Sequence, residues 1–104
     1  MADAKQRTLP VPPGIAGDDD AREMIRAWVA HQGLHCSVNI GEWGDREATG
    51  WGVLLSDVAR HVANALHEQS GIEPQQVLDH IREIFNSELD EPTEDATGGF
   101  VQIT

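Results

Sequence analysis

The stretch Arg22-Glu-Met-Ile-Arg-Ala-Trp-Val-Ala-His-Gln-Gly-Leu-His-Cys-Ser-Val-Asn-Ile-Gly41 decides the fold. Its second half alternates between polar and apolar residues, as an extended strand with one buried face does. The apolar face of that strand carries Leu34, Cys36, Val38 and Ile40. Because the backbone donors and acceptors of a strand must be paired, it needs a neighbour. The residues before it can supply one, so the pattern predicts a β-hairpin over about 23–31 and 34–41.

A two-residue turn at Gln32-Gly33 sets the expected register of this hairpin, with Gly33 supplying the positive φ that such turns require. The apolar residues then oppose one another as Val29 with Cys36, Ala27 with Val38, and Ile25 with Ile40. A slip by one residue would turn one strand's apolar side chains to water. The outer face would carry Met24, Arg26 and Trp28. The alternative for residues 20–34 is a helix that begins at Asp20 and stops at Gly33.

Two amphipathic helices follow the hairpin. Residues 51–69 carry apolar side chains at helical spacing, and residues 74–87 carry a second such stripe. Gly71 ends the first helix, and Pro74 stands where a proline opens the second. Because the link between them is short, we expect the two helices to be antiparallel.

These elements predict a two-layer α+β domain over residues 21–87, in which both helices pack on the apolar face of the hairpin. We expect a flexible tail at residues 1–20 and an acidic tail at 88–104. A two-stranded sheet has two open edges. A third strand from Phe100–Ile103 or from Thr8–Val11 would cover one of them, or two copies would pair, and we favour self-association.

Composition excludes several classes of function. The chain has 104 residues, with 18 Asp and Glu against 7 Lys and Arg, for a net charge of −11. It therefore cannot neutralise nucleic-acid phosphates. Much of the acidic excess lies in residues 18–20 and 88–95, so the body does not resemble a DNA mimic. One cysteine forms no internal disulfide. With neither a secretory signal nor a run of about 20 apolar residues, we expect a cytoplasmic protein without a membrane span.

One polar row on the first helix is a candidate metal or catalytic site. It consists of Asp57, His61, Asn64 and Glu68 at i, i+4, i+7 and i+11, and His80 of the second helix could meet it. Such a row suits a divalent metal, or Asp57 orienting His61 as a general base. It equally suits a hydrogen-bonded helix flank, which we favour because no second histidine stands four residues from His61. We therefore expect no catalytic residue, metal or cofactor.

The run Trp51-Gly-Val-Leu-Leu-Ser-Asp-Val-Ala-Arg-His61, together with residues 25–30 and 33–38, resembles a family of short bacterial proteins known as a domain of unknown function. The resemblance covers roughly residues 22–68. It implies the same order of a hairpin and helices, and it brings no activity. The signature positions that it implies are Trp51, Gly52, Asp57, Arg60 and His61.

Three functional hypotheses follow. The first is a non-catalytic protein-interaction module, homodimeric, that meets its partner through the outer hairpin face at Met24, Arg26 and Trp28 or through a sheet edge. The second is a small metal-binding protein or enzyme that uses Asp57 and His61. The third is an acidic chaperone-like dimer for a basic partner, which the charge of −11 permits.

Overall fold

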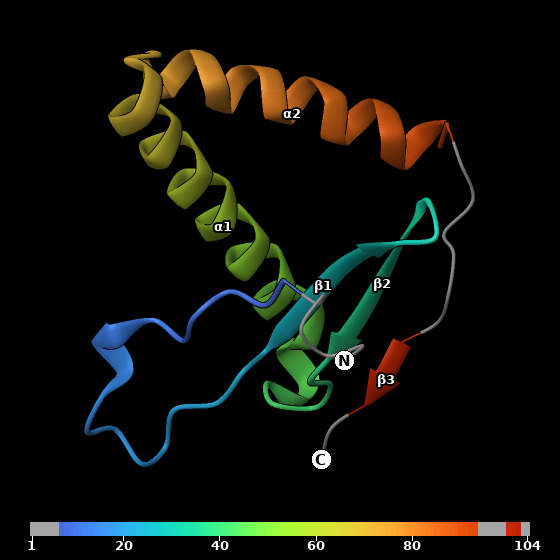
Figure 1. Cartoon of the computed structure of the whole chain (residues 1–104). Coiled ribbons are helices and arrows are strands. Elements are labelled where there is room, and N and C mark those ends of the chain that lie inside the picture. Colours follow the sequence, from blue (N-terminus) through green and yellow to red (C-terminus); the bar gives the residue numbers. More distant parts are fainter. Residues whose placement is uncertain (1–6, 94–99, 103–104) are drawn as a thin grey trace.

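The computed structural model describes residues 7–93 and the backbone of residues 100–102, and it has the predicted α+β class (Figure 1). The predicted tail residues 1–6, 94–99 and 103–104 lie outside this range. The elements are the strands β1 (Ile25–Ala30), β2 (Gly33–Val38) and β3 (Phe100–Gln102), the helices α1 (Glu47–Ser70) and α2 (Pro74–Asp90), and the 3-10 turns Pro13–Ile15 and Gly44–Arg46. None of the described helices is long and apolar enough to span a bilayer.

The hairpin is present, and its register differs from the predicted one by two residues. Val29 lies opposite Leu34, Ala27 opposite Cys36 and Ile25 opposite Val38. The turn residues are His31 and Gln32, with φ of 51° and 63°, so the predicted turn at Gln32-Gly33 is wrong. Because a shift by two residues leaves every side chain on its face, the apolar pattern could not discriminate between the two registers. The predicted division into two faces is therefore retained.

A third strand comes from the C-terminal end of the chain. β3 pairs in parallel with β2, with Cys36 opposite Phe100 and Val38 opposite Gln102, and the strand order is β1-β2-β3. The alternative third strand, Thr8–Val11, does not form, since residues 8–11 have no strand structure. β1 therefore keeps one edge without a strand neighbour in the described part of the chain.

Both helices are longer than predicted. α1 begins at Glu47 instead of near residue 51, and α2 continues to Asp90 instead of ending near residue 87. The turn between them has the predicted chemistry. Gly71 adopts the left-handed conformation with φ of 72° and donates its N–H to the carbonyl of His67 at 2.8 Å. Pro74 then occupies the first turn of α2, where its missing N–H costs nothing.

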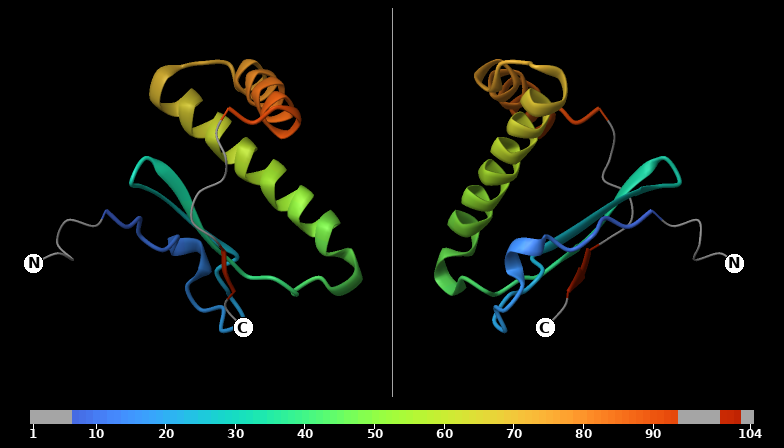
Figure 2. Two further views of the ribbon diagram at one scale, coloured as in Figure 1. Left: turned by 90° about the vertical axis from the view of Figure 1, so that its right-hand side faces the viewer. Right: turned by 60° about the vertical axis from the view of Figure 1, so that its left-hand side comes forward.

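The predicted packing of both helices on the hairpin does not form within one chain. α1 and α2 contact each other, but no Cα atom of either helix lies within 8 Å of a Cα atom of the described strands. Figure 2 shows the helical pair standing away from the sheet in two further views. Ala63, 1% exposed, is the one fully buried residue among those described. The helices and the sheet are thus two arms joined by the crossover at residues 39–46.

Candidate interaction surface

The apolar face of the sheet, which the sequence pattern predicts to be buried, is exposed to solvent. Val29 is 82% exposed and its cross-strand neighbour Leu34 is 54% exposed. Cys36, on the same face, is a free thiol and only half-buried. An apolar pair at the tip of a hairpin gains stability only when something covers it. Among the described residues, no layer fully covers this face.

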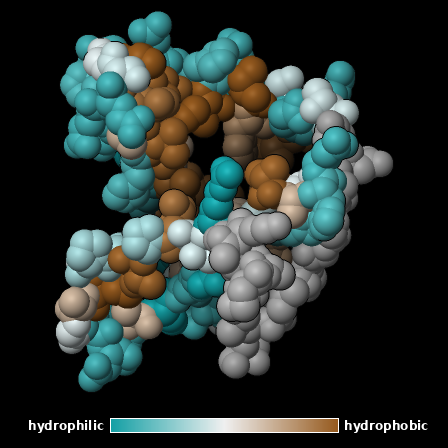
Figure 3. All heavy atoms as spheres, in the orientation of Figure 1, coloured by the Kyte–Doolittle hydropathy of each residue, from teal (hydrophilic) through white to brown (hydrophobic). Residues whose placement is uncertain are grey.

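The helices also leave apolar side chains open. The exposed set on the two helices includes Leu55, Val58, Val62, Ile84, Phe85 and Leu89. Three of them follow an i, i+3, i+7 spacing along α1, which is the spacing of a helix-packing seam. Figure 3 shows hydrophobic residues around a hollow between the helices and the hairpin. The open faces of both arms thus border one space, which we call the central hollow.

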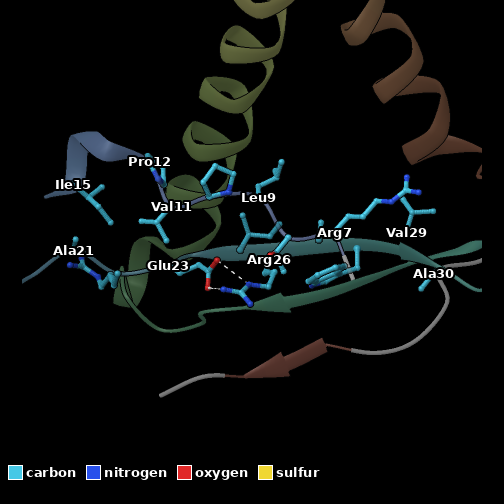
Figure 4. Close-up of a pocket in the computed structure, with 16 residues that line it drawn as sticks. Arg7, Leu9, Val11, Pro12, Ile15, Ala21, Glu23, Arg26, Val29 and Ala30 are labelled. Atoms are coloured by element: carbon cyan, nitrogen blue, oxygen red, sulfur yellow. Dashed lines mark hydrogen bonds and ion pairs between the residues drawn. The ribbon is translucent and has the colours of Figure 1, made fainter. Parts of the chain in front are cut away.

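The N-terminal segment covers part of the sheet. An open pocket of about 1150 Å³ lies between residues 7–15 and β1. Figure 4 shows Leu9 and Val11 on the same side of β1 as Val29, with the ion pair of Arg26 and Glu23 on the other side. Leu9 remains 91% exposed, so this segment does not seal the face.

The outer face is less open than the sequence suggests. Met24 precedes β1 and is half-buried, and its sulfur lies 3.8 Å from the Asn39 side-chain nitrogen. Trp28 is also half-buried and lies opposite His35. Arg26 is exposed and forms an ion pair with Glu23 at 3.0 Å. The three predicted interaction residues therefore present mainly one charged side chain.

Glu47 holds the crossover between the two arms. One carboxylate oxygen accepts the N–H of Gly41 at 3.0 Å and the indole N–H of Trp51 at 2.9 Å, and the other accepts the N–H of Trp43 at 3.0 Å. The bond from Gly41 is the largest cause that lowers the pKa of Glu47 below its usual value of 4.5; partial burial opposes it, and the two Trp donors add to it. Bonds to an ionised acceptor are stronger than neutral ones. This carboxylate therefore fixes how the chain leaves the sheet.

The aromatic side of the crossover is equally constrained. The Trp43 and Trp51 rings meet edge to face at 5.6 Å. A Cβ atom at Gly50 would overlap the Trp43 ring, so only glycine allows this ring to rest on α1. Glu42 adds an ion pair with Arg22 at 2.6 Å. We call Trp43, Glu47, Gly50 and Trp51 the crossover latch.

Sequence reasoning missed Glu47, whereas it predicts that Trp43 and Trp51 anchor the crossover from the hairpin to the helix, and both lie there. The available signal was the spacing of Glu47 and Trp51, which places them one turn apart on a helix. The backbone partners of Glu47, Gly41 and Trp43, lie in an irregular loop, however, and hydrophobic periodicity does not predict the conformation of a loop.

The predicted polar row on α1 does not form an enclosed site. Asp57, His61, Glu68 and His80 are all exposed. Asp57 pairs with Arg60 at 3.9 Å rather than with His61. The described residues contain no group of three His, Cys, Asp or Glu side chains that could hold a metal ion. Of the signature positions, Trp51 is half-buried, whereas Gly52, Asp57, Arg60 and His61 are exposed on one helix.

Comparison with known proteins agrees with the predicted resemblance. A family model described as a domain of unknown function (DUF5076) matches residues 8–93. A solved structure from the photosynthetic bacterium Rhodopseudomonas palustrus CGA009, described as "a putative pyruvate dehydrogenase", is 34% identical with a TM-score of 0.67. That match covers 90% of this chain and 94% of the other. No curated protein matches the sequence.

Proposed function

This chain belongs to the domain-of-unknown-function family DUF5076, and we propose that it is a non-catalytic, cytoplasmic interaction module that works as a homodimer. The single observation that carries the proposal is the amount of surface that one chain leaves open. A compact monomer of 11.4 kDa exposes about 5800 Å² by the usual scaling with mass. This chain exposes 8976 Å². The surplus is therefore about 3200 Å².

The shape of the chain supports the same conclusion. Its Cα radius of gyration is 15.8 Å. A compact domain of this length has a radius of about 13 Å. A standard interface removes about 800 Å² from each partner, and obligate dimers remove more. The surplus, to which the extended residues before β1 contribute, exceeds the area that a standard interface removes from one partner.

The exposed apolar faces favour a second copy of the chain as the partner that covers them. Each chain carries an apolar helical face and an apolar sheet face. The helical face of one copy can therefore cover the sheet face of the other. A twofold interface uses the same surface patch on both subunits. Hydrophobic residues predominate around the central hollow (Figure 3), and the cationic Arg7 lies beside Val29 (Figure 4), so a basic partner held by charge is disfavoured. The acidic chaperone-like alternative is therefore less well supported.

The enzymatic alternative has weaker support than the dimer. The solved neighbour is described as "a putative pyruvate dehydrogenase". The candidate residues Asp57 and His61 are exposed, and Asp57 pairs with Arg60. We therefore do not extend that activity to this chain.

Sedimentation equilibrium tests the proposal. We expect the wild-type chain to be a dimer at about 50 µM and Val29→Asp to be a monomer, because a carboxylate cannot be buried in an apolar interface without a partner. Arg26→Gln is the matched control, since Arg26 lies on the other face of β1, and it should leave the dimer intact. A wild-type chain that sediments as a folded monomer would overturn the proposal.

A further inference from the structure

We propose that the two chains of this homodimer exchange arms, so that the helical arm of one chain packs on the apolar sheet face of its partner. This inference rests on the proposed homodimer and specifies its interface. Each chain has two exposed apolar faces. One is the α1 seam of Leu55, Val58 and Val62, and the other is the sheet pair of Val29 and Leu34. Helix on sheet is one of the stable two-layer arrangements of protein domains.

The crossover latch explains why these faces do not meet within one chain. Glu47 binds Gly41 and Trp43 from the loop while it also binds Trp51 on α1. The ring of Trp43 lies against Gly50, where no side chain could fit. Loop and helix are therefore held as one joint, which fixes the direction in which α1 leaves the sheet. With this joint intact, neither helix brings a Cα atom within 8 Å of a Cα atom of the described strands.

A joint that holds two complementary faces apart favours packing between chains. Hydrophobic residues surround the central hollow between the helical arm and the hairpin (Figure 3). A single body that enters this hollow can pack on the sheet face. When that body is the arm of a second copy, twofold symmetry places the first chain's arm in the second hollow as well. The same contact, a helical arm on a sheet face, then fills both hollows, so the arrangement is closed and symmetric. Helix-on-helix or sheet-on-sheet pairing would cover only one of the two faces.

Cross-linking of single-cysteine chains tests this arrangement. Cys36→Ala removes the native thiol, and Val29→Cys or Val62→Cys is then added as the one cysteine of a chain. The two variants, one of them carrying a mass tag, are mixed, allowed to exchange, and treated with a short bismaleimide. Because each chain has a single thiol, every cross-linked product joins two chains, and the tag distinguishes mixed from like pairs.

We expect the mixed product, Val29→Cys with Val62→Cys, to exceed both like products several-fold. Dominant Val62→Cys self-linking would indicate helix-on-helix packing, and dominant Val29→Cys self-linking would indicate sheet-on-sheet packing. Either result overturns the exchange, as does a dimer, verified by sedimentation, that yields no mixed product. Far-UV circular dichroism checks that the Cys36→Ala chain is folded. If that folded chain and the wild type are both monomers, the proposed function fails, which is a different result from a dimer with the wrong cross-links.

Discussion

At the residue scale, Glu47 is the group whose chemistry most affects the structure. Its pKa is lowered mainly by the Gly41 N–H, with the Trp43 and Trp51 N–H groups adding to the effect. A carboxyl group whose folded pKa is depressed contributes stability that is present above its unfolded pKa and lost as the pH falls through its folded pKa. Its contribution is therefore complete at neutral pH and disappears below the ordinary value of 4.5.

Glu47→Gln should lower the free energy of unfolding at neutral pH and have a smaller effect in acid. Glutamine has a single oxygen acceptor, so it cannot satisfy three N–H donors with a charged group. Urea unfolding followed by Trp fluorescence, from about pH 7 to about pH 3, measures the difference between the wild type and the variant. Glu68→Gln on the exposed side of α1 is the control and should show no such trend. A pH-independent difference for Glu47→Gln would contradict the assignment.

At the element scale, α1 shows what sequence patterns predict and what they leave open. The helical period located both helices, and Gly71 and Pro74 marked the turn between them. The start of α1 was placed too late because Gly50 counts against a helix by intrinsic propensity, by roughly 1 kcal/mol. Here a tertiary contact requires that glycine, since Trp43 lies where a Cβ would be. Periodicity likewise fixed the faces of the hairpin and could not distinguish its register from one shifted by two residues.

The two glycines of α1 give a matched pair of substitutions. Gly50→Ala should destabilise the chain by about 1–3 kcal/mol, because overpacking against an aromatic ring outweighs the gain in helix propensity. Gly52→Ala has no atom within 4 Å of the added Cβ and should stabilise the chain by up to about 1 kcal/mol. Urea unfolding at one protein concentration measures both. Equal stabilisation by the two substitutions would show that Trp43 does not rest on Gly50.

At the scale of the whole molecule, charge and apolar area act in opposite directions. Each chain carries a net charge of −11, so two chains repel each other when they associate. Hydrophobic residues predominate around the central hollow, and burying them does not depend on counter-charges. Added salt shortens the range of the repulsion, whereas it would weaken an interface built from opposite charges. The response of the dimer to salt therefore reports which kind of surface is buried.

We expect the dimer to tighten when NaCl is raised from about 0.05 M to about 0.5 M, because the Debye length falls from more than 10 Å to less than 5 Å over this range. Sedimentation equilibrium at several protein concentrations gives the dissociation constant at each salt concentration. Replacing Asp18, Asp19 and Asp20 with Asn is the matched charge control. These exposed residues precede β1, so their neutralisation should tighten the dimer at low salt and have little effect at high salt. A dimer that dissociates as salt rises would instead require ion pairs across the interface, and the apolar contact proposed between the helical arm and the sheet would then be wrong.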